Sequence, residues 1–179
     1  MEEFKQVLKI PIARVAVIIG KKGETKKQIE KESNTKIKIT KEGEVTITAE
    51  DSFDAWITKS IIKAIGRGFS PEIALLLLDD AYSFEIVEMK DWAKTDKAMA
   101  RLRGRVIGEH GKSREKIEDL TDSYISVFGK TVGIIAKVEK MPFVRKAVEM
   151  LLGGSRHTTV FRMLEEEKRK WEKQELMGR

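Results

Sequence analysis

The sequence contains no cysteine, and this absence excludes disulfide bonds, thiolate catalysis and cysteine-ligated zinc or iron–sulfur sites. Histidine is almost as scarce: His110 and His157 are the only two, and histidines in these positions do not make a metal or acid–base site. No leading apolar run resembles a signal peptide, and no segment approaches the ~20 apolar residues that a membrane helix needs. We therefore expect a cytoplasmic protein with no membrane contact and no cofactor.

Charge, by contrast, is abundant, with 35 Lys and Arg residues against 29 Asp and Glu residues, a net charge of +6 and an isoelectric point near 9.4. A mild basic excess fits a polyanionic partner without requiring one. The excess is concentrated in residues 101–114, where five cations are opposed only by Glu109. These cations are Arg101, Arg103, Arg105, Lys112 and Arg114. Such a cluster can also be a solvated helix face, so its meaning depends on the motif that it surrounds.

A glycine-containing segment occurs twice in the chain. Residues 17–23 read VIIGKKG and residues 105–111 read RVIGEHG, so Gly108 follows Gly20 by 108 − 20 = 88 residues. The same offset aligns further pairs: Ile19 with Ile107, Gly23 with Gly111, Ile29 with Ile117, Ile37 with Ile125, and Ile39 with Val127. We interpret the chain as two copies of one module. The first domain covers residues 1–80 with a connecting helix, and the second covers residues 81–179 with a C-terminal helix.

Hydrophobic periodicity predicts the elements of the first copy. We expect a strand at 4–10, a short helix at 12–19, a helix at 24–33, strands at 35–40 and 45–49, a long helix from 51 or 52 to about 66–68, and a connecting helix from Pro71. Phe53 and Trp56 fall on the apolar stripe of the long helix, which favours core packing for both.

The second copy repeats this order. We expect a strand at 82–87, a short helix centred on 95–102, a helix after the glycine turn, strands at 124–128 and 132–138, and a helix from Pro142 to Gly153. A C-terminal helix follows, with Val160, Leu164 and Trp171 on one face. The predicted fold class is therefore α+β.

The glycine turns carry the functional signal. Two glycines separated by two residues let the backbone turn tightly and come within contact distance of a ligand, because no Cβ intervenes. The helix that follows directs its free N–H groups and positive dipole end at the turn, which favours a phosphate. The aliphatic residues before the turn supply an apolar floor. A phosphate site beside an aliphatic surface predicts a cleft for about four single-stranded nucleotides.

The motifs VIIGKKG and RVIGEHG resemble the signature of the K-homology (KH) domain. Because two strands and a helix follow each turn, the order resembles the type I form, βααββα, with a three-stranded antiparallel sheet and the helices on one face. The resemblance implies two KH domains, a non-catalytic RNA-binding function and an aliphatic base-binding surface. Neither turn has an aromatic neighbour, which agrees with such a surface.

The resemblance also implies which residues contact RNA. They are Val17, Ile18, Ile19, Gly20, Lys21, Lys22, Gly23, Lys26 and Ile37 in the first domain, and Arg103, Arg105, Val106, Ile107, Gly108, Glu109, His110, Gly111, Lys112, Arg114 and Ile125 in the second. Lysines occupy both variable positions of the first turn, whereas Glu109 in the second repels phosphate and the flanking cations compensate. We predict that both domains bind RNA.

A wider resemblance covers nearly the whole chain. The tandem modules, the second signature RLRGRVIGEHGKSREKIE and the tail LLGGSRHTTVFRML are similar to the Krr-like, Dim-type KH factors of small-subunit ribosome maturation. This resemblance implies binding to single-stranded RNA near the 3′ end of small-subunit ribosomal RNA. It also implies contacts with translation initiation factor two or with the nuclease that trims that end.

Three other functions have partial support in the sequence. The segment GEHGKS ends like a nucleotide-binding P-loop, but that motif requires glycine at the position of Val106. An RNA-processing hydrolase would need a matched set of carboxylates or histidines, which this sequence does not offer. Asp79–Asp80 and Glu165–Glu167 are typical of solvated helix flanks. A third alternative is an adaptor in which one KH module or the C-terminal helix serves protein contacts.

Overall fold

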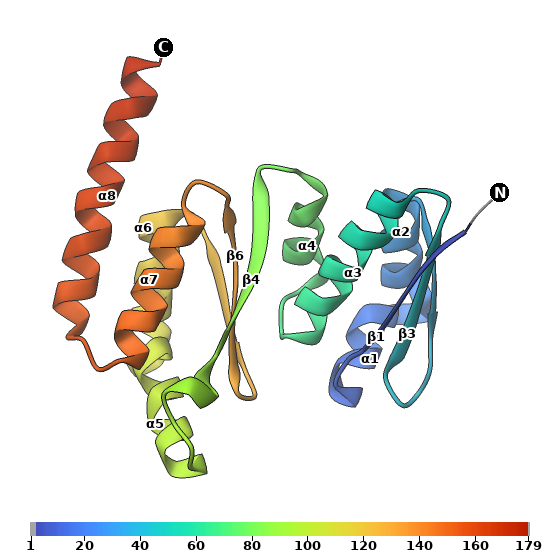
Figure 1. The fold of residues 1–179 in the computed structure, drawn as a ribbon, viewed down its shortest axis with the longest axis horizontal. Helices are drawn as coiled ribbons and strands as arrows, with labels where there is room; N and C mark the ends of the chain where they lie inside the picture. Colours follow the sequence, from blue (N-terminus) through green and yellow to red (C-terminus); the bar gives the residue numbers. More distant parts are fainter. Residues whose placement is uncertain (1–2, 179) are drawn as a thin grey trace. The chain divides into compact units, whose positions relative to one another are not determined.

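The computed structural model describes residues 3–178 and divides into two units, Met1–Phe84 and Glu85–Arg179. Each unit contains a three-stranded sheet with its helices packed on one face (Figure 1). This architecture confirms the predicted α+β class with two KH domains and a C-terminal helix. Within the described residues, every helix is too short or too polar to cross a membrane. The domain limits inferred from the sequence stay a prediction.

The first unit follows the predicted order of elements. These are β1 (Phe4–Lys9), α1 (Ile12–Ile19), the 3₁₀ turn η1 (Lys21–Gly23), α2 (Glu24–Glu32), β2 (Thr35–Ile39), β3 (Glu44–Ala49), α3 (Ser52–Gly66), α4 (Pro71–Ala74) and the 3₁₀ turn η2 (Leu75–Leu78). The strands are antiparallel in the order β1-β3-β2, so β2 is an edge strand. Asp51 begins α3 by accepting a hydrogen bond from the N–H of Phe53.

The face that α3 turns to the core differs from the predicted stripe. Phe53 and Trp56 are 59% and 57% exposed, whereas Ala55 and Thr58 are fully buried. The reason is helical register, because steps of four and three residues back from the buried Ile62 lead to Thr58 and Ala55. The prediction that Phe53 and Trp56 pack in the core was therefore wrong.

The second unit repeats the arrangement. Its elements are β4 (Tyr82–Glu88), the 3₁₀ turn η3 (Met89–Asp91), α5 (Asp96–Ile107), the 3₁₀ turn η4 (Glu109–Gly111), α6 (Lys112–Thr121), β5 (Tyr124–Phe128), β6 (Thr131–Lys137), α7 (Met141–Leu152) and α8 (His157–Met177). The sheet order is β4-β6-β5, with β5 at an edge. Thr95 caps α5, which then runs unbroken to the glycine turn. The predicted short helix is thus the first part of α5.

Matched hydrogen bonds recur in the two units. Glu30 Oε1 accepts the N–H of Ile37 at 2.7 Å, and Glu118 Oε1 accepts the N–H of Ile125 at 2.7 Å. Each bond ties the edge strand to the helix that follows the glycine turn. A buried hydroxyl pair also recurs at the same offset: Ser33 with Thr35, and Thr121 with Ser123. The repeat therefore extends from the sequence to its internal contacts.

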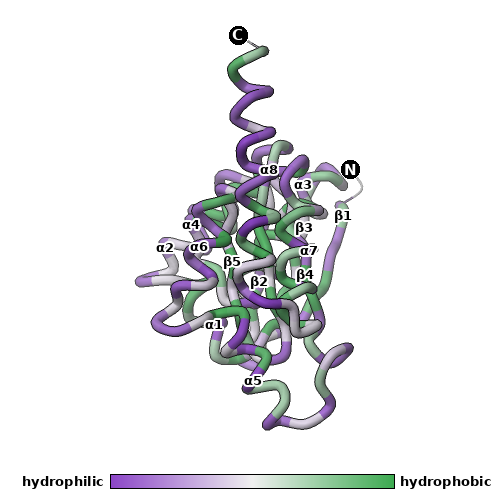
Figure 2. The backbone as a smooth tube through the Cα atoms, turned by 90° about the vertical axis from the view of Figure 1, so that its left-hand side faces the viewer, coloured by the Kyte–Doolittle hydropathy of each residue, from purple (hydrophilic) through white to green (hydrophobic). Residues whose placement is uncertain are grey.

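The first half of α8 belongs to the core of the second unit. Val160 and Leu164 are fully buried. Trp171 packs edge to face on Phe143, with ring centroids 5.4 Å apart. The outer half of the helix extends beyond the rest of this unit (Figure 1) and is mainly hydrophilic (Figure 2). The predicted inward face of this helix is confirmed.

Candidate nucleic-acid interface

The two glycine turns share one backbone conformation. Gly20 has φ 71° and ψ 179°, and Gly108 has φ 75° and ψ 173°. The second glycines, Gly23 and Gly111, both have φ 77°. The residue before each second glycine is also left-handed, at φ 51° in the first turn and 52° in the second. Left-handed residues other than glycine are uncommon, so this agreement marks one shared loop structure.

The two glycines of a turn have different tasks. The φ and ψ of Gly20 are essentially restricted to glycine. A Cβ at Gly20 would also lie 2.1 Å from Thr25 Oγ1, and one at Gly108 would lie 2.5 Å from Ser113 Cβ. A Cβ at Gly23, in contrast, would meet no atom within 4 Å. The first glycine therefore packs the turn onto the next helix, whereas the second exposes its backbone to a ligand.

The helices after the turns begin without a side-chain cap. The N-cap residues of α2 and α6 are Gly23 and Gly111, and neither helix has a side-chain cap hydrogen bond. Their first N–H groups are thus directed at the turn, where the helix dipole adds partial positive charge. This combination suits a phosphate group.

The first turn is strongly basic. Lys21 and Lys22 are both exposed at its tip. Lys26, one turn into α2, is instead paired, with its Nζ 2.9 Å from Glu30 Oε1. Of these three predicted phosphate contacts, Lys21 and Lys22 are therefore the ones open to a ligand, and Lys26 would have to leave its partner.

The second turn carries mixed charge. Glu109 and His110 are exposed, and their side chains lie 3.7 Å apart, which makes an ion pair only when the histidine is protonated. Lys112 is exposed at the start of α6. Arg114 Nε lies 3.7 Å from Glu118 Oε2, the same helical spacing as the Lys26 pair. The two turns therefore share their backbone but differ in electrostatics.

Four of the seven predicted aliphatic residues of the floor are buried. Ile18 and Val106 are 0% exposed, Ile37 is 2% exposed and Ile125 is 4% exposed. These side chains belong to the cores of the two units, because they project from the inward faces of α1, α5 and the edge strands. They support the cleft from below and are buried in this structure, and their assignment as direct contacts stays a prediction.

The accessible floor is made by neighbouring residues. Val17, Ile19 and Ile107 are half-buried, as a contact surface requires. Ile39 and Val127 are also half-buried on the edge strands, although they are not among the predicted contacts. The strand period of two would have found them, because each lies two residues after a buried isoleucine on the same side of its strand.

Two arginines of α5 have structural contacts that the sequence did not indicate. The guanidinium of Arg105 donates to the carbonyl oxygens of Leu151, at 2.8 Å, and Ser155, and so holds the C-terminal end of α7. Arg103 Nη1 donates to the carbonyl oxygen of Gly129 at 3.0 Å, which links α5 to the β5–β6 turn. Arg105 thus fixes the frame of the second domain.

The surroundings of the Glu118 carboxyl on α6 change its pKa. Burial raises the pKa of the Glu118 carboxyl, while the hydrogen bond from the N–H of Ile125 and the charge of Arg114 oppose this rise. Its side chain is 22% exposed. Burial therefore destabilises the charged form of this carboxyl, which links α6 to β5.

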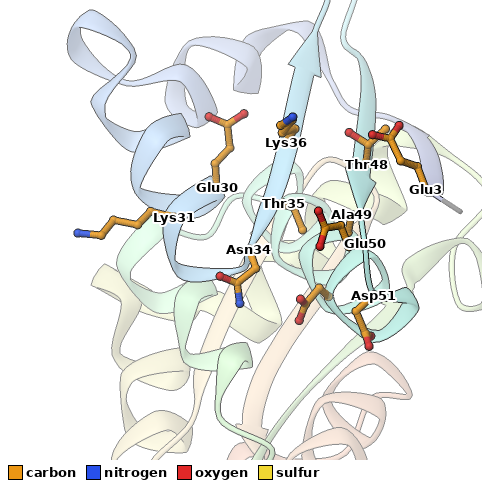
Figure 3. Close-up of a pocket in the computed structure, with 11 residues that line it drawn as sticks. Glu3, Glu30, Lys31, Asn34, Thr35, Lys36, Thr48, Ala49, Glu50 and Asp51 are labelled. Carbon is orange, nitrogen blue, oxygen red and sulfur yellow. The ribbon is translucent and has the colours of Figure 1, made fainter. Parts of the chain in front are cut away.

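A pocket of about 640 Å³ in the first unit lies away from the glycine turn, where the C-terminal end of α2 meets the ends of β2 and β3 (Figure 3). Carboxylates outnumber cations in its lining, with Glu3, Glu30, Glu50, Asp51 and Asp54 against Lys31 and Lys36. Such a lining disfavours a polyanion. The basic turn at the other end of α2 is therefore the better RNA site of this unit.

Family models match both units. The KH domain model covers residues 5–53. The model described as a eukaryotic type KH-domain (KH-domain type I) covers residues 83–169.

Individual relatives extend this result. The chain is 47% identical over 169 residues to KH domain-containing protein MJ0443 from Methanocaldococcus jannaschii, across 92% of this chain and 74% of that protein. It is 32% identical over 103 residues to the pre-rRNA-processing protein PNO1 from Chaetomium thermophilum, across 56% of this chain and 39% of that protein. A chain in the a/eIF2alpha-aDim2p-rRNA complex from Pyrococcus horikoshii OT3 matches with a TM-score of 0.88 and 44% identity, over 94% of this chain and 96% of that one. The chain belongs to the Dim2/PNO1 family of KH-domain proteins.

Proposed function

We propose that this protein is a non-catalytic, cytoplasmic RNA-binding factor of small-subunit ribosome maturation. Its two glycine turns hold the phosphates of single-stranded ribosomal RNA near the 3′ end, and the half-buried aliphatic residues beside them receive the bases. The observation that carries this proposal is the recurrence of one loop structure at both turns, each leading into an uncapped helix N-terminus. That arrangement offers backbone N–H groups to phosphate twice in one chain.

The relatives support the choice of RNA and of a protein partner. The Chaetomium thermophilum relative is named a pre-rRNA-processing protein, and the Pyrococcus horikoshii complex contains rRNA and a/eIF2alpha. We extend both properties to this chain, with translation initiation factor two as its protein partner. The nuclease that trims the ribosomal RNA end is a further partner in this proposal.

The first turn provides the direct test. The double substitution Lys21→Asp and Lys22→Asp reverses both exposed charges, and aspartate tolerates the left-handed backbone at position 22. We expect the affinity for labelled single-stranded RNA, measured by fluorescence anisotropy, to fall by about tenfold or more, because phosphate contacts dominate such binding.

The matched control places the same charge change elsewhere in the unit. Lys5 and Lys9 are exposed on β1, at the sheet edge opposite to β2. Glutamate is used there because strands disfavour it less than aspartate. An equal loss of affinity in Lys5→Glu/Lys9→Glu, or no loss in the turn variant, would remove the first clamp from the proposal.

The non-catalytic part is tested separately. End-labelled single-stranded RNA is incubated with the full chain, with and without Mg²⁺, and its length is followed on a denaturing gel. We expect the RNA to remain intact in both conditions. Shortened product that scales with protein concentration would favour the hydrolase alternative.

An adaptor role for the second domain is the alternative that a specific observation favours. Glu109 opposes phosphate at the second turn, and the exposed outer half of α8 ends in Leu176 and Met177, which are 74% and 77% exposed. The substitution His110→Asp in the full chain, which adds a second carboxylate at the exposed tip of the turn, distinguishes the two functions. A loss of RNA affinity supports two RNA clefts, whereas unchanged affinity indicates that the second domain serves protein contacts.

A further inference from the structure

The second unit contains a pocket of about 500 Å³ beside the predicted cleft, with which it shares Arg105, Gly108, Glu109 and Lys112. It is bounded by α5, the glycine turn, α6 and the first turns of α8, and its lining includes no residue of β5. The volume lies within the range of about 300–1,000 Å³ that is typical of ligand sites. In the described part of the first unit, α3 is followed by the four-residue helix α4 and the turn η2, which are much shorter than the 21-residue α8.

The pocket and the cleft use opposite faces of α6. Arg114 and Glu118 are four residues apart and face β5, because Glu118 accepts the N–H of Ile125. Lys112 and Lys116 each precede one of them by two residues, which is a rotation of about 200° around the helix. Lys112 and Lys116 line the pocket.

The wall that α8 contributes is fixed by its own contacts. His157 Nε2 lies 2.8 Å from the carbonyl oxygen of Arg105, and Val160 is fully buried. Further along the helix, Glu165 Oε1 lies 3.2 Å from Lys116 Nζ. The pocket is thus preformed, and a ligand need not order α8 on binding.

Positive charge dominates the pocket. Arg101 and Lys112 are exposed, and no residue within 3–178 forms an ion pair or hydrogen bond with either side chain. The hydrogen bonds of the Arg105 guanidinium go to the carbonyl oxygens of Leu151 and Ser155 and not to a carboxylate. Glu109 is the single carboxylate among the lining residues. This balance favours an anion.

A buried, unpartnered hydroxyl also points to a ligand. Ser113 lines the pocket in the first turn of α6 and is 5% exposed, and its Oγ has no hydrogen-bond partner in the described part of the chain. The same turn begins a 10-residue helix without a side-chain cap. The hydroxyl adds to the charged donors Arg101 and Lys112, beside the uncapped N–H groups that the turn offers to the phosphate in the cleft.

The rest of the pocket suits a ribose or base. Phe161 and His157 form an aromatic wall, with ring centroids 6.0 Å apart, and Lys116 Nζ lies 4.7 Å from the centroid of the Phe161 ring. Gly104 opens the pocket on the α5 side, because a Cβ built there would meet no atom within 4 Å. A phosphate site beside an aromatic wall matches one nucleotide.

We propose that this pocket binds one further nucleotide of the RNA strand held in the second cleft. The phosphate lies at the first turn of α6, near Lys112 and Arg101, and the ribose or base lies against the wall of Phe161 and His157. The inference rests on the proposed function, because Gly108 and Glu109 belong to the glycine turn and also line the pocket. An RNA strand that leaves the glycine turn therefore enters the pocket directly.

The test compares RNA lengths in the full chain. The first clamp is disabled by Lys21→Asp/Lys22→Asp, so that the second domain is measured. Fluorescence anisotropy then gives the affinities for random-sequence pools of about four nucleotides, the reach of one cleft, and of about eight. We expect the longer pool to bind about fivefold or more tightly than the shorter one, as expected for an added stacked nucleotide.

Two substitutions outside the predicted cleft contacts should remove that gain. Gly104→Leu fills the pocket from α5, and Arg101→Glu reverses one of its charges. Both variants should bind the short pool with the affinity of the parent, and they should bind the long pool no more tightly than the short one. Lys146→Glu, the same reversal at an exposed position on α7, should keep it.

The outcomes separate the inference from the function on which it rests. If neither pool binds before the pocket is altered, RNA binding by the second domain fails. If the pools bind but Gly104→Leu and Arg101→Glu keep the length gain, the pocket does not hold RNA. If no gain exists and a glutamate-rich peptide binds in an Arg101-dependent manner, the pocket is an acidic-peptide site and the inference is overturned.

Discussion

Gly20 and Gly23 differ in what an added methyl group would meet. At Gly20 it would collide with Thr25, in a backbone region that is essentially reserved for glycine, whereas the space above Gly23 is open. We expect Gly20→Ala to lower the free energy of unfolding by about 2–4 kcal/mol and Gly23→Ala by about 1 kcal/mol. Urea denaturation of the two variants measures this difference. Equal losses of stability would contradict the different roles assigned to the first and the second glycine of the turn.

Glu118 gives a pH dependence whose sign follows from its raised pKa. Because burial raises the folded-state pKa above the ordinary 4.5, the stability that depends on this group is fully present below pH 4.5 and is lost as the pH rises through the folded pKa. Glutamine keeps an oxygen for the N–H of Ile125 but has no charge to bury. We expect Glu118→Gln to exceed the parent in urea midpoint at neutral pH and to match it at acidic pH.

The control at the same position is Glu118→Ala. It removes the acceptor for the N–H of Ile125, so it should lose about 1 kcal/mol at acidic pH, and less at neutral pH because it also removes the buried charge. A glutamine variant that is less stable than the parent at neutral pH would show that the hydrogen bond to a charged acceptor outweighs the burial of that charge.

At the scale of elements, α8 is a structural part of the second domain as well as an extension of it. Leu164 is fully buried in its first half, and Leu176 is 74% exposed near its end. We expect Leu164→Ala to destabilise the second unit by about 2–5 kcal/mol, because a core cavity forms. Leu176→Ala should change stability by no more than about 0.5 kcal/mol. Thermal unfolding followed by circular dichroism compares them, and similar midpoints would mean that α8 is not docked.

At the scale of the whole molecule, two clefts in one chain set the salt dependence of RNA binding. If each turn neutralises about two phosphates, the plot of log K against log salt should have a slope of about −3, given about −0.7 per phosphate on a single strand. A titration of RNA affinity against salt concentration checks this value. A flat line would contradict both clamps, and a slope of about half this size would indicate that one domain binds.

The repeat, the order of the elements and the positions of the turns could be predicted because they depend on local patterns. A glycine pair at a fixed spacing and a period of two or 3.6 are visible in the chain itself. The accessible cleft surface could not be predicted as well. Ile18 and Ile19 are adjacent aliphatic residues on α1, and only the packing of that helix shows that the first is buried and the second is half-exposed.

The sequence by itself determined that this chain has two matching glycine turns, each between helices and followed by two strands and a helix. Those features depend on backbone preferences and hydrophobic periods within a few residues. The tertiary structure alone decided that Arg105 holds the end of α7, 46 residues away, and that α8 adds a wall beside the second turn. Contacts between residues so far apart in the chain depend on how helices pack, and a local pattern carries no record of that packing.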